Sequence, residues 1–257
     1  IRAWQNHLID ARDKNGKPYS ATYLKTINNQ MSALFRFAGK YYGLKENPVA
    51  LAGSMGKSNA EEMQFWTLEE FQKFAAGLSD PTAYAAFNIL FWTGMREGEL
   101  LALTLADVDF ERKGIFVRHS YARLNGEDVI SDPKTRRSKR FITVPDFLLE
   151  IIRDYAAKLY EYQPEERLFE CTKYWLKEQL ERCCQRTGVK VIRVHDIRHS
   201  HASLLINMGT DALLVQQRLG HEKVSTTLGT YAHLYPDRTN NVADRLEALA
   251  FPGEKKP

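Results

Sequence analysis

A small, polar, glycine-rich stretch at residues 53–60, with the sequence GSMGKSNA, divides the chain into two unequal parts. This composition is typical of a flexible linker, which we place at residues 53–62. A chain of 257 residues is long enough for one large domain or two modest ones. The sequence therefore predicts a short first domain, residues 1–52, and a larger second domain, residues 63–257.

The first domain is expected to be helical. Residues 13–18 are rich in turn formers, and Ser20 follows them as a candidate helix N-cap. Apolar residues then recur at three- and four-residue steps to about residue 40, which is the period of an amphipathic helix. We expect so short a helical unit to be an incomplete domain.

The second domain is expected to be mainly α with one small antiparallel β-sheet, an α+β fold. Residues 67–70, Thr-Leu-Glu-Glu, form a capping-box pattern that opens a helix. Short runs with β-branched residues at 114–120, 127–131 and 139–144 are separated by turn signals and predict the sheet. Further helices are predicted at residues 81–92, 97–103, 146–162, 172–187, 195–208, 211–219, 224–233 and 237–250.

The composition narrows the class of protein. The chain has 44% apolar and 26% charged residues, as ordinary globular proteins do. No apolar run approaches the ~18–20 residues that would span a bilayer, so no membrane partner is expected. The odd number of cysteines, three, argues against a disulfide-stapled secreted domain and favours a reduced, cytosolic chain.

Positive charge is concentrated in two places. Residues 1–60 hold nine lysines and arginines against three acidic residues, although the whole chain carries a net charge of only +4. Residues 134–140 add five positive charges and no acidic residue. Such patches suit a polyanion such as nucleic acid, but a solvated charged surface explains them equally well.

The last third of the chain is rich in histidine. A zinc site is one interpretation, because His195 and His199 are four residues apart, as in zinc proteases. However, Asp196 stands where that motif has glutamate, and the cysteines lack the paired spacing of metal ligands. We therefore predict no metal site.

Two pairs of residues, each three positions apart, suggest an anion site. On a helix, His195 and Arg198 would share one face, and an arginine can bind two phosphate oxygens at once. Arg96 and Glu99 have the same spacing. Glu99 could therefore orient Arg96, or the two could form an ordinary surface ion pair.

Four short motifs occur in a fixed order. They are T-G-M-R-x-x-E-L around Arg96, H-x-x-R at His195 and Arg198, L-G-H ending at His221, and Tyr231 ten residues later. With a lysine in the expected sheet turn, they resemble the tyrosine recombinases, the phage-integrase family of site-specific DNA recombinases. Residues 20–48 resemble the end of that family's core-binding domain, and residues 61–257 resemble its catalytic domain. The resemblance implies that the core-binding domain is truncated here.

The resemblance assigns the covalent chemistry. It implies that Tyr231 attacks the scissile DNA phosphate and forms a 3′-phosphotyrosyl link, while Arg96 and Arg198 clamp the non-bridging oxygens. Lys134 would protonate the leaving 5′-oxygen, with Lys139 as the second choice. Such an exchange keeps the phosphodiester bond energy in the covalent intermediate, so no cofactor is expected.

The resemblance also assigns supporting roles. His195 would be the acid/base residue beside the tyrosine, His221 a hydrogen-bond donor to the phosphate, and Glu99 an acidic support. His233 could pack against the tyrosine or assist it. The candidate DNA contacts are Lys25, Arg36, Arg136, Arg137, Lys139, Arg140 and His199.

The segments 120–145 and 225–234 look most like integrases of conjugative transposons. The resemblance implies a bacterial, cytoplasmic enzyme that excises and inserts a mobile element as a tetramer on double-stranded DNA, with room for an excision factor. The helix expected at 237–250 would pack either on a neighbouring subunit or on the subunit to which it belongs. Two rivals stay open: a type IB topoisomerase with similar chemistry, and a catalytically idle DNA-binding protein.

Overall fold

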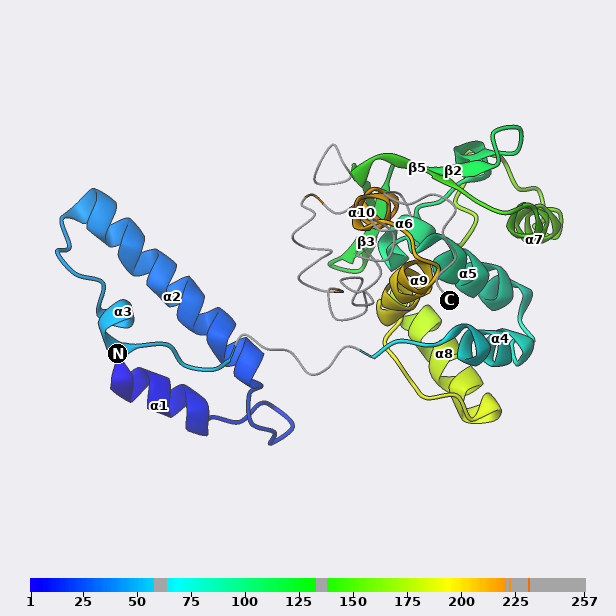
Figure 1. Cartoon of the computed structure of the whole chain (residues 1–257). Helices are drawn as coiled ribbons and strands as arrows, with labels where there is room; N and C mark the ends of the chain where they lie inside the picture. The colour runs from blue at the N-terminus through cyan, green and yellow to red at the C-terminus, as the bar shows by residue number, and fades with distance from the viewer. Residues whose placement is uncertain (58–63, 133–137, 221, 223–230, 232–257) are drawn as a thin grey trace, which may run out of the picture. The chain divides into compact units, whose positions relative to one another are not determined.

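The computed structural model of the chain describes residues 1–57, 64–132 and 138–220, together with Glu222 and Tyr231. It divides into two compact units, Ile1–Met63 and Gln64–Pro257 (Figure 1). Apart from Tyr231, the helices expected at residues 224–233 and 237–250 lie outside the described residues.

The N-terminal unit consists of helices α1 (Arg2–Asp10), α2 (Ala21–Tyr42) and α3 (Pro48–Ala52). Ser20 is the N-cap of α2, as its sequence position predicts, and its side chain accepts a hydrogen bond from the backbone of Tyr23. Residues 53–57, which are expected to belong to the linker, pack onto this unit. Met55 is buried, and the backbone N–H of Lys57 donates to the carbonyl of Ala21.

The larger unit contains seven α-helices and a short 3₁₀ segment among its described residues. They are α4 (Leu68–Ala76), α5 (Pro81–Thr93), α6 (Glu97–Leu101), η1 (Leu105–Asp107), α7 (Asp146–Ala156), α8 (Lys173–Thr187), α9 (Asp196–Asn207) and α10 (Ala212–Leu219). The expected capping box is present at the start of α4. The mainly helical fold with small antiparallel strands is confirmed.

The described strands form two antiparallel sheets rather than the single one expected. One sheet has the order β1-β2-β5, from Val108–Asp109, Gly114–Val117 and Arg140–Thr143. The other pairs β3 (Ser120–Leu124) with β4 (Glu127–Ser131) across a turn at Asn125 and Gly126, both with positive φ. The expected strand 114–120 is divided after Val117, and its two parts pair with different partners.

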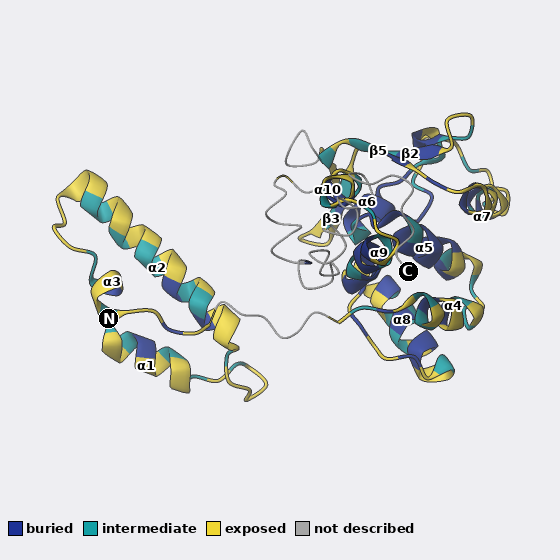
Figure 2. Cartoon of the chain, in the orientation of Figure 1, coloured by how far each residue is buried: buried dark blue, intermediate teal, exposed yellow. Residues whose placement is uncertain are grey.

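Helix α5 is the centre of the larger unit. Nine of its thirteen residues are buried, so it is apolar on all sides rather than amphipathic. It packs against α4, α7 and α9, and Figure 2 shows the buried residues concentrated along α5 and α9. One contact to α4 is a parallel stack of the Phe71 and Phe91 rings, with centroids 3.7 Å apart. A rigid α5 therefore fixes the segment that follows its C-terminus.

Candidate active site

A tight turn at the end of α5 leads to the first candidate residue. Gly94 caps the helix with a φ of 66°, a conformation that suits glycine. A Cβ atom at Gly94 would lie 2.5 Å from a ring carbon of His201, so a larger residue would also clash with α9. Because the turn is fixed in this way, Arg96 sits in a defined position at the N-terminus of α6.

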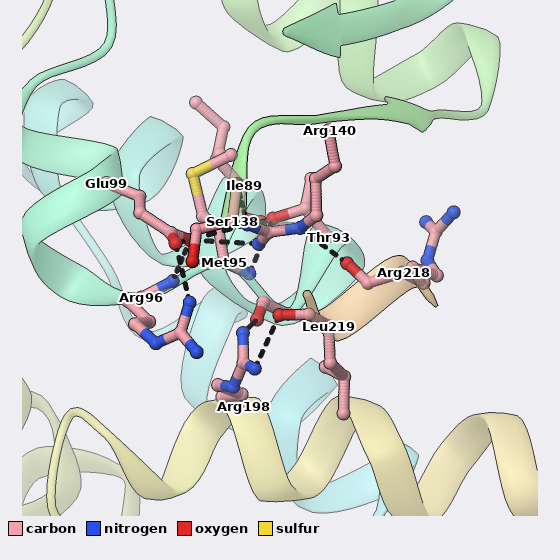
Figure 3. Close-up of polar contacts among 11 residues, drawn as sticks. Ile89, Thr93, Met95, Arg96, Glu99, Ser138, Arg140, Arg198, Arg218 and Leu219 are labelled. Carbon is pink, nitrogen blue, oxygen red and sulfur yellow. Dashed lines mark hydrogen bonds and ion pairs between the residues drawn. The ribbon is translucent and has the colours of Figure 1, made fainter. Parts of the chain in front are cut away.

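Arg96 and Glu99 hold each other at this N-terminus (Figure 3). Arg96 is the N-cap of α6, which begins at Glu97, as the helix predicted from residue 97 does. The carboxylate of Glu99 accepts hydrogen bonds of 2.8 Å from both the backbone N–H and the Nη1 of Arg96. The pair therefore caps the helix and fixes the guanidinium direction, while the Arg96 side chain stays 37% exposed.

Arg140 is the second partner of Glu99. Its Nη2 and Nη1 lie 2.9 Å and 3.1 Å from the two carboxylate oxygens, in a forked arrangement. Burial by itself raises the pKa of Glu99, but hydrogen bonding and charge from Arg140, with the charge of Arg96, lower it to about 2. Arg140 is expected from the sequence to contact DNA; instead its side chain turns inward and is only 7% exposed.

Arg198 lies in the first turn of α9 and is held by backbone carbonyls. Its Nη1 donates to the carbonyl of Gly94 at 2.8 Å and its Nη2 to that of Leu219 at 2.6 Å. These carbonyls belong to the C-terminal ends of α5 and α10, where helices leave acceptors unpaired. Burial, followed by the positive charges of Arg96 and Arg140, lowers the pKa of Arg198 to about 9.

Tyr231 is fully buried, and its hydroxyl contacts His199, not His195. The hydroxyl oxygen lies 2.5 Å from Nδ1 of His199. Burial raises the pKa of Tyr231 to about 12 and lowers that of His199 to about 4. At neutral pH the tyrosine is therefore the donor and the neutral imidazole the acceptor.

His195 lies next to this pair, on the solvent side. Its ring packs edge-on against that of His199, with centroids 5.4 Å apart. Partial burial, with the charge of Arg198, lowers its pKa. The sequence predicts a DNA contact for His199 and does not indicate its contact with Tyr231. The signal that could have found it is its position one helical turn after His195.

Arg218 and His201 form a further contact that the sequence does not predict. Arg218 donates to Nε2 of His201 at 2.9 Å and to the carbonyls of Thr143 and Trp92 at 2.9 Å and 3.0 Å. Burial, with the charge of Arg218, lowers the pKa of His201 to about 3. Through these hydrogen bonds, Arg218 ties α10 to the neutral imidazole of His201 on α9, to α5 and to the end of β5.

The remaining candidates are distributed as follows. In the N-terminal unit, Lys25 donates to the side chain of Ser54, and Arg36 is exposed on α2. In the larger unit, Lys139 is exposed and forms an ion pair of 3.1 Å with Asp132. The candidates outside the described residues are Lys134, Arg136, Arg137, His221 and His233.

The described residues contain neither a metal-binding cluster nor a membrane-spanning helix. Within them, no group of three or more histidine, cysteine, aspartate or glutamate side chains is arranged to hold a metal ion. The described helices include none with the length and apolar character needed to cross a membrane.

Comparison with known proteins gives a consistent result. Residues 65–238 match the model of the phage integrase family. The chain is 32% identical to the ICEBs1 integrase of Bacillus subtilis, over 97% of this chain and 70% of that protein. It is 26% identical to a XerC-like tyrosine recombinase of Caldanaerobacter subterraneus, over 90% of this chain and 67% of that protein.

A solved structure has the same fold. A fragment of the Tn1549 transposon integrase, in complex with circular intermediate DNA, superimposes with a TM-score of 0.77 at 23% identity. The match covers 95% of this chain and 84% of that one.

Proposed function

The chain belongs to the phage integrase family of tyrosine site-specific recombinases, and from this premise we propose how its residues cut and rejoin DNA. It acts on DNA in the excision and insertion of a mobile element. The observation that carries the proposal is the hydrogen bond from Tyr231 to His199, on the same helix that presents Arg198.

Tyr231 is the nucleophile in this proposal. Its hydroxyl oxygen forms a bond to the scissile phosphorus as the bond to the 5′-oxygen breaks, and its proton passes to Nδ1 of His199. A phenol whose pKa is raised to about 12 needs such a base. The approaching phosphate, being negative, favours the imidazolium that forms. Because Tyr231 is fully buried, DNA binding must first make it accessible.

The two arginines stabilise the phosphate as charge develops on its oxygens. Arg198 has more N–H groups than its two carbonyl hydrogen bonds use, and Arg96 is partly exposed beside it. Lys134 and His221 keep the roles that the sequence implies: Lys134 protonates the leaving 5′-oxygen, and His221 donates to the phosphate. Rejoining reverses each step, so the bond energy is conserved.

We further propose that the enzyme works as a tetramer on two duplexes in the bacterial cytoplasm, with an excision factor as an additional partner. Its DNA contacts outside the active site would include Arg36 and Lys139, which are exposed. The helix expected at 237–250 would pack on a neighbouring subunit. Deleting residues 237–257 and measuring assembly on DNA tests this packing, and unchanged tetramer formation contradicts it.

The nucleophile is tested with nicked suicide duplexes that carry candidate element ends. The full chain should form a covalent protein–DNA adduct, and Tyr231→Phe should form none. Tyr174→Phe is the matched control, because Tyr174 is exposed on α8 and should behave as wild type. Absence of an adduct with the wild-type chain, or an adduct with Tyr231→Phe, would overturn the proposal. Relaxation of a plasmid without element ends would favour a topoisomerase.

The proton acceptor is tested by comparing His199→Asn with His195→Asn. Removing a general base lowers the rate by about 10²–10⁴-fold, so His199→Asn should show the larger loss in single-turnover adduct formation. The pH–rate profile of His199→Asn should also lack its acid limb, because protonation of His199 causes that fall in rate. If His195→Asn shows the greater loss and the profile of His199→Asn is unchanged, the base is His195.

A further inference from the structure

Arg140 is in contact with two segments that position the proposed phosphate-binding arginines, Arg96 and Arg198. Its forked pair with Glu99 reaches α6 and therefore Arg96. Its Nε donates to the carbonyl of Arg218 at 2.7 Å, in the last turn of α10. The next carbonyl, that of Leu219, accepts from Arg198. Figure 3 shows these side chains converging on Glu99 and on the end of α10.

We propose that Arg140 is a positioning residue for the strand-cleavage reaction, which holds the carboxylate of Glu99 in place so that Arg96 and the end of α10 keep their geometry. This inference rests on the proposed function. It replaces the role as a DNA contact that the basic cluster at 134–140 indicates.

The geometry does not fit a DNA contact. The side chain is only 7% exposed, and each of its three nitrogens donates to the protein. Lys139, the preceding residue, is the opposite case: its side chain is 49% exposed and pairs with Asp132 at the surface. Arg140 is the first residue of β5, where it pairs with Val117 of β2, whereas Lys139 lies in the bend that precedes the strand. Of the two, only Lys139 presents its charge to an approaching duplex.

The charge of Arg140 matters because Glu99 is itself only 3% exposed. The charged groups around this carboxylate are Arg96 from α6, Arg140 from β5 and Arg198 from α9. Without Arg140, Glu99 would lose its strongest hydrogen-bonding partner. The rise that burial causes in the pKa of Glu99 would then no longer be offset. Glu99 would then take up a proton at higher pH, or draw the guanidinium of Arg96 further onto itself. Either result misplaces Arg96 for phosphate binding.

The test compares Arg140→Gln and Arg140→Lys with the control Arg123→Gln in the full chain. Arg123 is an exposed arginine of β3 that pairs with Asp128, so it matches the change in charge without touching Glu99. For each variant, single-turnover adduct formation on the suicide duplex is measured from pH 4 to 8.5, and duplex affinity by fluorescence anisotropy.

Arg140→Gln should lower the cleavage rate by about 100-fold, the scale of a misplaced catalytic group, with duplex affinity within about twofold of the control. Protonation of Glu99 should then replace protonation of His199 as the cause of the acid limb, so the limb should move to higher pH, and adding Glu99→Gln should abolish that movement. Arg140→Lys keeps the positive charge but cannot make the forked contact with Glu99. It should therefore cleave faster than Arg140→Gln and show a smaller shift of the acid limb. If Arg140→Gln does not fold, Arg140→Lys supplies the same comparison.

Three results would overturn the inference. They are a loss of affinity without a loss of rate, a rate loss with an unmoved acid limb, and wild-type behaviour of both variants. Failure of the wild-type chain to form any adduct is different, because it contradicts the proposed function itself. The wild-type lane of the same experiment therefore separates the two proposals.

Discussion

The candidate active site has two halves that hold positive charge in different ways. In the carboxylate half, Arg96 and Arg140 share the buried carboxylate of Glu99. In the carbonyl half, Arg198 is 3% exposed and donates to two backbone carbonyls. Among the described residues, no carboxylate forms an ion pair with Arg198. Asp196, its neighbour in sequence, pairs with Arg193 instead.

The difference indicates what each half contributes. Two arginines on one carboxylate leave a net charge of about +1, and the ion pairs fix side-chain directions. Carbonyl dipoles orient Arg198 without cancelling its charge, and a buried charge without a counter-ion is costly. A DNA phosphate would supply the missing negative charge. We therefore expect Arg198 to contribute most to phosphate binding in the transition state, and the carboxylate half to contribute mainly through position.

The largest effect should follow from Arg198→Gln. Glutamine lacks the charge and cannot donate to both helix ends, so adduct formation should fall by about 10³-fold, the loss expected for a main charge-stabilising donor. The melting temperature should also fall, because the carbonyls of Gly94 and Leu219 lose a donor. Arg182→Gln, an exposed arginine on α8, is the control. A loss of stability with adduct formation within tenfold of the control would contradict this assignment.

Arg96→Gln should have a smaller effect, about 10²-fold on adduct formation. Arg140 continues to hold Glu99 in this variant, and the Arg96 side chain is partly exposed, so the melting temperature should change little. The same suicide-duplex assay and a thermal melt measure both quantities. If Arg96→Gln destabilises the fold more than Arg198→Gln, the two halves have been assigned in reverse.

The sequence predicts the parts of this arrangement that depend on local signals. Ser20 and the capping box at residues 67–70 act within one helical turn, so the neighbouring residues suffice to locate them. The spacing of Arg96 and Glu99 likewise indicates their contact. The resemblance to a known family adds the order of the motifs, and the family assignment is confirmed.

The parts that were missed depend on contacts between distant segments. Arg140 pairs with Glu99 across 41 residues, and His199 meets Tyr231 across 32. The composition of the basic cluster at 134–140 does not reveal which member turns inward, since that depends on the register of β5 against β2. The division of the expected strand after Val117 likewise depends on which strands its two parts pair with.

The smallest expected effect is on the pH dependence of stability, which should differ between the two halves of the site. In the carboxylate half, the pKa of Glu99 is lowered to about 2, so its stabilising contribution is present above its ordinary pKa and lost only as pH falls toward 2. Around the carbonyl half, His201 has a pKa of about 3. A histidine whose pKa is lowered by folding takes up its proton at higher pH in the unfolded chain than in the folded one. The free energy of unfolding therefore declines as pH falls below about 6.5.

Urea unfolding between pH 7.5 and 5 measures this decline. His201 is buried, so its share should approach ~1.4 kcal/mol per pH unit below its ordinary pKa. His201→Gln should flatten the slope, because a glutamine oxygen can still accept from Arg218 but does not titrate. His119→Gln, at an exposed histidine, should leave the slope unchanged. Equal slopes for wild type and His201→Gln would show that protonation of His201 does not control stability here. The acid sensitivity around the carbonyl half would then come from His199 or His195, whose pKa values are also lowered by burial.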